Sequence, residues 1–194
     1  MRLKIVQTGD EVLRQKARPL SSEEILSADM QRLIADLRDT MRDAPGVGLA
    51  APQVGLSLQL TVIEDRPEYQ QEADAAQLKE RARTPVEFHV LFNPIIVASD
   101  GPTVEFVEGC LSINGFSAVV PRSFSVKVEY LDENAASKQI EASGWYARIL
   151  QHEIDHLQGT LYVDHMHSRT LMTVENFRRF WKDATMQEIH RRLD

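Results

Sequence analysis

The stretch GWYARILQHEIDHLQG, residues 144–159, constrains the fold most, because two glycines bound a helical pattern that carries two histidines. His152 and His156 are four residues apart, so on a helix both imidazoles lie on one face and can share a cation. Glu153 points slightly away from the pair and can polarise a water molecule without binding the ion. The pattern HExxH therefore predicts a metal site on a helix, with an exposed charged helix as the alternative.

Two imidazoles need a further ligand, and the chain offers several. Tyr162 occupies the position where a metzincin site has its third histidine, which excludes that class. Glu175 is a candidate for a thermolysin-like site. His165 and His167 follow the helix closely, but the chain would have to fold back tightly, so exposure to solvent is the preferred interpretation.

Cys110, in the stretch EGCLS, is the remaining candidate. A lone cysteine is most often a buried small hydrophobe. Here Glu108, Ser112 and Asn114 make its surroundings polar, and Gly109 permits close approach of the backbone. One cysteine and two histidines with an open position form a catalytic arrangement typical of zinc, and the thiolate also suits ferrous iron.

Composition limits the classes of function. The 194 residues, 43% hydrophobic and 26% charged, are typical of one globular domain with a core. The net charge of −7 argues against broad binding of DNA or RNA. The single cysteine excludes an internal disulfide and suits a reducing compartment. We see no apolar run that could span a membrane and no hydrophobic leader, and we expect a cytoplasmic protein without membrane contact.

Helical periodicity appears near both ends of the chain. Residues 23–43 predict an amphipathic helix that Ser21 or Ser22 caps, and residues 170–194 predict a C-terminal one. The apolar side chains expected along one face are Met30, Leu33, Ile34, Leu37 and Met41 in the first helix, and Val174, Phe177, Phe180, Trp181, Ala184 and Ile189 in the second.

Strand patterns fill the middle of the chain. Residues 58–64 predict a strand, and the polar residues 65–85 a surface excursion with room for a short helix. Residues 86–99 are rich in strand formers, and Pro94 can divide them into two strands. A hairpin follows, with its turn at residues 132–137.

Because strands and helices do not alternate regularly, we expect an α+β fold rather than a doubly wound one. In this fold antiparallel sheets pack around a central helix that carries HExxH, with an N-terminal and a C-terminal helix. We find no repeat and no linker, so residues 1–194 are predicted to form a single catalytic domain.

Three stretches in this order, GVGLAAPQ (46–53), EGCLS (108–112) and QHEIDH (151–156), resemble the signature motifs of the peptide deformylases. The shared chain order runs from GDEVLR (9–14) to about Asp164. GFSAVVPR and the run around the histidines are similar to the branch with mitochondrial and plant organellar enzymes, which also has bacterial members. The resemblance implies a hydrolase that removes the formyl group from the N-terminal formyl-methionine of nascent polypeptides and releases formate.

The resemblance also implies a role for each matching residue. Glu153 would be the general acid–base, and the Gln53 amide with the N–H of Leu111 would bind the oxyanion. Fe²⁺ is the expected native ion, and Zn²⁺, Ni²⁺ or Co²⁺ can replace it. The ligands of this single divalent ion would be Cys110, His152 and His156.

Substrate-binding residues are expected around these groups. Gly46 and Gly48 would leave room for a peptide backbone, and Gly109 lies beside the cysteine. Ser117 stands where some bacterial members have an arginine that holds the peptide, and Arg148 where others have an aliphatic residue. Trp145 departs from the family in the same way as Arg148. The apolar pocket for methionine would be formed in part by Val47, Leu49, Trp145 and Ile149.

Arg122 and Asp155 are candidates to orient a metal ligand or Glu108. Two other functions remain open: a zinc endopeptidase with Glu175 as third ligand, and a non-catalytic, metal-stabilised interaction domain. The C-terminal helix is expected to pack on the domain, and contact with the ribosome near its exit tunnel is a further hypothesis. It rests on four arginines of an otherwise acidic protein, Arg178, Arg179, Arg191 and Arg192.

Overall fold

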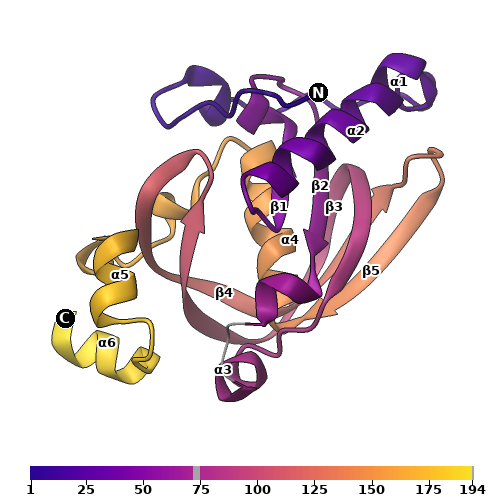
Figure 1. The fold of residues 1–194 in the computed structure, drawn as a ribbon. Coiled ribbons are helices and arrows are strands. Elements are labelled where there is room, and N and C mark those ends of the chain that lie inside the picture. Colours follow the sequence, from indigo (N-terminus) through magenta and orange to yellow (C-terminus); the bar gives the residue numbers. More distant parts are fainter. Residues whose placement is uncertain (72–74, 194) are drawn as a thin grey trace.

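The computed structural model describes residues 1–71 and 75–193, and it confirms the α+β class. The helices are α1 (Ser22–Leu26), α2 (Ala28–Asp43), α3 (Ala75–Glu80), α4 (Gly144–Leu157), α5 (Val174–Phe180) and α6 (Met186–Leu193). The strands are β1 (Gly48–Ala50), β2 (Leu60–Asp65), β3 (Val86–Cys110), β4 (Ile113–Leu131), β5 (Ser137–Ser143) and β6 (Met172–Thr173). Figure 1 shows α4 at the centre, with α5 and α6 to one side. Within the described ranges, no helix is long and apolar enough to cross a membrane.

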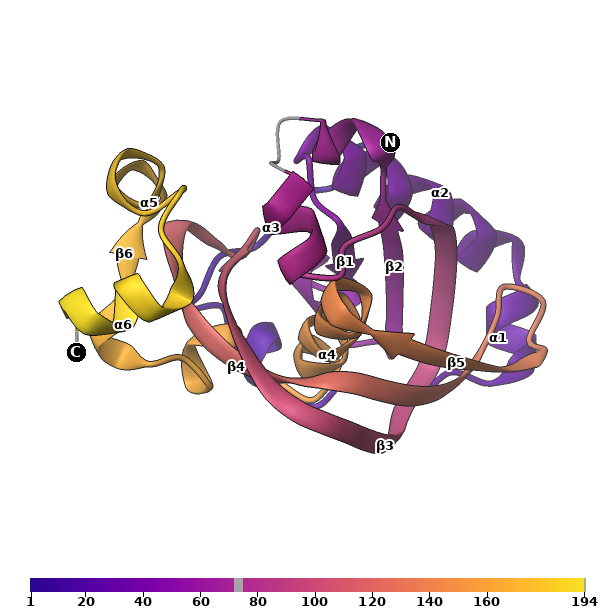
Figure 2. The same cartoon turned by 90° about the horizontal axis from the view of Figure 1, so that it is seen from below.

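In the described part of the chain, the strands form one six-stranded antiparallel sheet. The sequence predicts antiparallel sheets but not how many. The strand order of the sheet is β1–β2–β3–β4–β5, and β6 pairs with β4. β3 and β4 pair from Phe92 and Leu131 to Cys110 and Ile113, and four shifts of register interrupt this ladder. Such irregularities bend strands, and in Figure 2 the two curved strands enclose α4.

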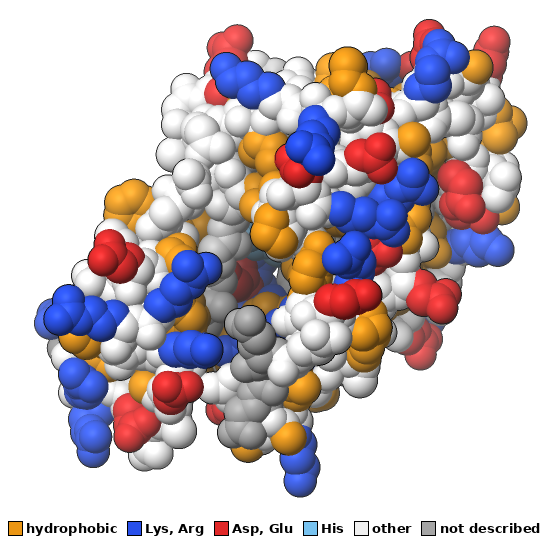
Figure 3. All heavy atoms as spheres, in the orientation of Figure 1, with side chains coloured by type: hydrophobic (Ala, Val, Ile, Leu, Met, Phe, Trp, Pro, Cys, Tyr) orange, Lys and Arg blue, Asp and Glu red, His pale blue; other side chains and the backbone are white. Residues whose placement is uncertain are grey.

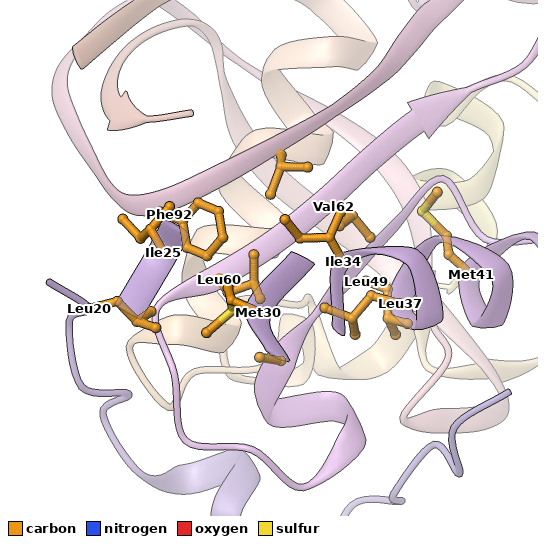
Figure 4. Close-up of a cluster of buried hydrophobic side chains, with 12 residues drawn as sticks. Leu20, Ile25, Met30, Ile34, Leu37, Met41, Leu49, Leu60, Val62 and Phe92 are labelled. Atoms are coloured by element: carbon orange, nitrogen blue, oxygen red, sulfur yellow. The ribbon is translucent and has the colours of Figure 1, made fainter. Parts of the chain in front are cut away.

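Two apolar clusters fix the elements that carry the site. In one, α2 packs on β1, β2 and β3, as Figure 4 shows. In the other, α4 packs on β2 to β5. Each fully buried aliphatic side chain contributes about 2 kcal/mol, so α4 is held firmly inside the curved sheet. The buried members of the second cluster are Ile63, Leu91, Val126, Val128, Ala142, Ala147, Ile149, Leu150 and Ile154.

The prediction of one helix over residues 23–43 is wrong, because the chain forms α1 and α2. Ser21 caps α1, as expected, but Ser27 ends it and begins α2, where its hydroxyl accepts the N–H of Met30 at 3.2 Å. A serine side chain competes in this way with the helical backbone for its hydrogen bonds. Of the predicted apolar face of α2, Met30, Ile34, Leu37 and Met41 are buried and Leu33 is partly buried.

The C-terminal segment also forms two helices rather than one over 170–194, of which residue 194 lies outside the described residues. The hydroxyl of Thr185 accepts the N–H of Glu188 at 3.2 Å, and the Glu188 carboxylate accepts the N–H of Thr185 at 2.9 Å. This reciprocal cap begins α6 and breaks the predicted stripe. Trp181 and Ile189 are buried, whereas Phe180 is half exposed.

Two predictions for the middle of the chain have different outcomes. Pro94 does not divide its strand, because β3 absorbs the proline at a register shift between Phe92 and Ile95. The hairpin turn between β4 and β5 and the short helix of the 65–85 excursion, α3, are both present. Residues 72–74 of that excursion lie outside the described residues.

Candidate active site

Helix α4 presents both histidines of the HExxH pattern to the interior. Gly144 opens the helix with a φ of 61°, and an added Cβ there would lie 2.6 Å from Cβ of Ala82. The rings of His152 and His156 are 5.1 Å apart, centroid to centroid. The helix therefore begins at a position suited to glycine and places two imidazoles on one side, as predicted.

Cys110 reaches these histidines from the end of β3. The tight turn between β3 and β4 pairs Cys110 with Ile113 and directs the thiol toward α4. Its Sγ lies 3.3 Å from Nε2 of His156. The three ligand atoms of Cys110, His152 and His156 lie within 4.8 Å of one another. One sulfur and two ring nitrogens at this spacing fit a divalent ion such as Zn²⁺ or Fe²⁺.

Glu108 orients the first of these histidines. Its Oε2 lies 3.0 Å from Nδ1 of His152, and Nε and Nη2 of Arg122 donate to its two oxygens at 3.0 and 3.1 Å. Arg148 adds a third donor at 2.6 Å, and Asp155 forms an ion pair with Arg122. Burial raises the pKa of Glu108, but the hydrogen bond to His152 and the Arg122 charge outweigh it, so the pKa lies well below its usual range. An ionised Glu108 accepts the Nδ1 proton of His152 and leaves Nε2 toward the site.

The contacts of Glu108 answer two questions that the sequence leaves open. Arg122 and Asp155 lie where the sequence suggests, behind the metal-ligand candidates. Arg148 lines the cavity but is buried, and it donates to Glu108 and to the carbonyls of Val120 and Val104. Its charge is therefore neutralised inside the protein rather than offered to a substrate.

Glu153 is buried on α4, and Gly48 on β1 makes the room for it. A Cβ on Gly48 would overlap the Glu153 carboxylate and would lie 2.8 Å from its Cγ. The Thr61 hydroxyl donates to Oε2 at 3.3 Å. Burial raises the pKa of Glu153 to about 7, against the opposing charge of His152 and the hydrogen bond from Thr61. The sequence assigns Gly48 to substrate access, but its most evident role is to accommodate Glu153.

Gln53 is buried with its amide group fixed in one orientation. Its Oε1 accepts the N–H of Ala50 at 2.9 Å, so Nε2 faces the thiol of Cys110 at 3.6 Å and Oγ of Ser112 at 3.3 Å. Leu111 follows Cys110 directly and lines the same cavity. Both candidate oxyanion donors thus belong to residues beside the thiol.

Several useful residues give no clear sequence signal. Ser112 supports Gln53 and donates its N–H to the thiol at 3.4 Å, and its place in EGCLS is the one available hint. Thr61 reaches Glu153 only through the fold. Arg81 and Arg83, from the excursion in which the sequence shows no chemistry, lie over the Trp145 ring at 5.1 and 5.3 Å.

A cavity of about 350 Å³ opens beside these groups, and Figure 3 shows the hollow in the molecular surface. Leu49 does not line this cavity and is wholly buried under α2, because successive β1 side chains point to opposite faces. There is little room for a side chain at position 46, because a Cβ added to Gly46 would lie 2.9 Å from Cδ1 of Leu111. Of the predicted substrate-binding residues, those that line it are Gly46, Val47, Gly48, Gly109, Trp145 and Ile149.

The other ligand candidates lie apart from the cluster. Glu175 is exposed on α5, and in the described ranges the metal-ligand group contains only the thiol and the two α4 imidazoles. His165 lies 3.3 Å from Asp155, and His167 lies 2.7 Å from Glu105. The endopeptidase alternative therefore lacks its third ligand.

Ser117 stands at the position where some bacterial members have an arginine. It is buried, and on β4 it pairs with Gly109 of β3.

The comparison with known families decides the relationship. A sequence model described as polypeptide deformylase matches residues 2–171. The chain belongs to the polypeptide deformylase family. The match contains the three deformylase motifs and every residue of the cluster, and it confirms the resemblance seen in the sequence.

Curated deformylases of plants, animals and bacteria are similar to this chain. The chloroplastic peptide deformylase 1A of Solanum lycopersicum is 48% identical over 172 residues, which are 89% of this chain and 62% of that protein. The mitochondrial peptide deformylase of Homo sapiens is 41% identical and matches 88% of this chain and 70% of its own. Peptide deformylase 3 of Streptomyces avermitilis is 43% identical, at 94% and 80%. The chain spans less than two thirds of the plant relatives, 62% and 64%.

Solved deformylase structures have the same fold. The class I type b enzyme of Acinetobacter baumannii with Met-Ala-Ser bound has a TM-score of 0.76 and 30% identity, over 86% of this chain and 99% of that one. The Synechococcus elongatus enzyme in complex with actinonin has a TM-score of 0.71 and 38% identity, over 85% and 79%.

Proposed function

We propose that this chain removes the formyl group from peptides that begin with N-formyl-methionine and releases formate and a free amino terminus. The observation that carries the proposal is one partly buried cluster, a thiol and two imidazoles beside a buried glutamate, at the wall of an apolar cavity. Relatives that match most of this chain are named peptide deformylase. Nascent polypeptides are the proposed source of the substrate.

Cys110, His152 and His156 would hold one divalent ion, proposed to be Fe²⁺ in the native protein, with Zn²⁺, Ni²⁺ or Co²⁺ as substitutes. When bound, such an ion supplies Lewis-acid polarisation of a carbonyl group and of water. Glu108 keeps His152 oriented for this task through its contact with Nδ1.

Glu153 is the proposed general acid–base. With a pKa of about 7 it can accept the proton of the attacking water near neutral pH and deliver it to the leaving nitrogen. The fixed amide of Gln53 and the N–H of Leu111 would donate to the oxygen of the formyl group as negative charge develops there. Loss of one such donor typically costs about 3 kcal/mol of transition-state stabilisation.

The decisive experiment measures formate release from formyl-Met-Ala-Ser after incubation with metal and after treatment with chelator. Metal-dependent release, with no cleavage of internal bonds in an unformylated peptide, is the expected result. Endoproteolysis, or binding of the formyl peptide without formate, would favour one of the two alternatives named above.

Contact with the ribosome near the exit tunnel is the partner that we propose besides the peptide. Lys and Arg side chains gather over the C-terminal helices in Figure 3. The charged residues that line a cavity between these helices are five basic ones, Arg178, Arg179, Lys182, Arg191 and Arg192, and two acidic ones, Asp183 and Glu188. Such a basic surface attracts phosphate. Co-sedimentation with ribosomes that salt weakens, and that truncation after Leu171 abolishes, would support the contact.

We also propose that this chain acts in the cytoplasm. Two plant relatives are named chloroplastic or chloroplastic/mitochondrial, and the human one mitochondrial. Fractionation of the source cells with an antibody against this chain would test the location.

A further inference from the structure

We infer that Val174 and Phe116 form a specificity-determining wall that contacts an apolar side chain downstream of the formyl-methionine. The inference rests on the function proposed above. It concerns two residues that line the same cavity as the metal-ligand candidates and the expected methionine pocket.

The two residues are neighbours because β6 extends the sheet. β6 pairs with β4, so that Thr173 lies opposite Phe116 and Met172 opposite Ser117. Val174 follows Thr173 and begins α5, which brings it beside Phe116. Both Phe116 and Val174 line the cavity that contains Cys110 and Glu153.

The aromatic ring of Phe116 is partly exposed to solvent. It is 44% exposed, and of the exposed large hydrophobic side chains in the described part of the chain it alone lines this cavity. An exposed apolar surface inside a ligand cavity favours an apolar contact. Val47, Trp145 and Ile149 line the same cavity. Because the methionine side chain is assigned to those three residues, the Phe116 ring is left for a later residue of the peptide.

The wall is held in place from behind. Val119, Met172, Trp181 and Ile189 form a buried cluster that packs β6, α5 and α6 on β4. His167 and His190 lie 2.7 and 2.6 Å from the two oxygens of Glu105 on β3. A fixed wall can discriminate between side chains, whereas a mobile one would adapt to each of them.

Val174 lies beyond the family match, which ends at residue 171. The segment that completes the cavity is therefore not part of the matched domain. For this reason we expect the preference to depend on the C-terminal segment together with Phe116, and not on the catalytic cluster.

The test compares kcat/KM for formyl-Met-Ala-Ser with the values for formyl-Met-Ala-Leu and formyl-Met-Leu-Ser. For the wild type, kcat/KM for one of the two leucine peptides should exceed kcat/KM for formyl-Met-Ala-Ser by about tenfold, mainly through a lower KM, as one apolar contact allows. Val174→Asp and Phe116→Ala should each reduce that ratio below about twofold. An acidic residue in the first turn suits a helix N-terminus, so the Val174→Asp chain should fold, and Phe116→Ala provides a second test.

Leu171→Asp is the matched control, because Leu171 is also 44% exposed but does not line the cavity. This variant should keep the wild-type ratio. Equal rates for the serine and leucine peptides in the wild type, or an unchanged ratio in both wall variants, would overturn the inference while the proposed function stands. Absence of formate from every formylated peptide would instead remove the proposed function, and the inference with it.

Discussion

At the scale of single residues, the proton affinity of the Glu153 carboxyl group is set more by the residues around it than by its place in HExxH. Gly48 leaves it space, Thr61 donates to it, and burial raises its pKa to about 7. A carboxyl group with this pKa can both accept and deliver a proton near neutral pH.

The first prediction concerns this carboxylate. Glu153→Ala should lower kcat for formate release by about a thousandfold, since general acid–base groups contribute on this order. Its metal content should stay at the wild-type level, because the ligand candidates are other residues. Glu175→Ala, which changes an exposed glutamate of α5, serves as the control. Near-normal turnover in Glu153→Ala would show that another group is the base.

The second prediction separates the thiol from the imidazoles. Cys110→Ser should weaken metal retention by more than about a hundredfold, beyond what loss of a supporting residue costs. Dialysis against a graded series of chelator concentrations, followed by elemental analysis, measures this. If metal content matched that of the wild type throughout the series, Cys110 would not be a ligand.

The third prediction tests the space beside the base. Gly48→Ala places a methyl group against the Glu153 carboxylate, which must move. A shift of about 1 Å can cost about a hundredfold in rate, so kcat should fall steeply while metal content is kept. Kinetics with metal analysis of the same sample are sufficient. Full activity would mean that β1 or α4 yields without effect on the site.

At the scale of elements, ion pairs join helices to strands. Nε and Nη2 of Arg42 on α2 each donate to the Glu64 carboxylate on β2 at 2.7 Å. The hydrogen bond from Arg42 lowers the pKa of Glu64 below 4.5, against the effect of burial. Because the folded-state pKa is lowered, this stabilisation is complete above pH 4.5 and is lost as pH falls through the lower, folded-state value.

The fourth prediction follows from that sign. Glu64→Gln should reduce the free energy of unfolding by about 1 kcal/mol at pH 7, and the difference should shrink below pH 4.5. Urea denaturation at pH 7 and at a pH below 4.5 measures this difference in the free energy of unfolding. The control is Glu68→Gln, since Glu68 is mostly exposed and lies 3.6 Å from Arg66. An equal loss at both pH values would mean that the contact is not electrostatic.

Local patterns explain which elements the sequence could reveal. Helix α4 was predictable because glycines bound it and its histidines have helical spacing. The breaks at Ser27 and Thr185 were missed, since a side-chain cap outweighs apolar periodicity there. The pairing of β6 with β4 involves just two residues of β6, so no strand pattern could predict it.

The same distinction applies to the site. Cys110 and the two histidines were open to prediction because metal chemistry restricts residue type and spacing. The support that Thr61 gives to Glu153 and the position of Val174 in the cavity arise only when distant segments pack together. Leu49 shows the reverse case, a residue of the right type in the right motif that faces the core.

At the scale of the whole molecule, the metal-ligand candidates are surrounded by a core that does not depend on them. The cluster of α2 with β1 to β3 and the cluster of α4 with β2 to β5 contain none of the three ligand candidates. The curved ladder of β3 and β4 likewise begins at Phe92 and Leu131 and reaches Cys110 only at its last pair. A fold built in this way should survive removal of the ion, in contrast to small domains that fold only around a metal.

The fifth prediction is that chelation lowers the melting temperature without unfolding the chain. An ion at one hundred times its Kd adds about 2.7 kcal/mol, and for a domain of this size that corresponds to about 5–10 °C. Circular dichroism at 25 °C should be unchanged after chelation, and added metal should restore both the melting temperature and formate release. Loss of the helical signal at 25 °C would mean that the metal is needed for the fold, which is what a metal-stabilised interaction domain requires. An unshifted melting temperature would show that the thiol and the imidazoles do not bind the ion in the folded protein.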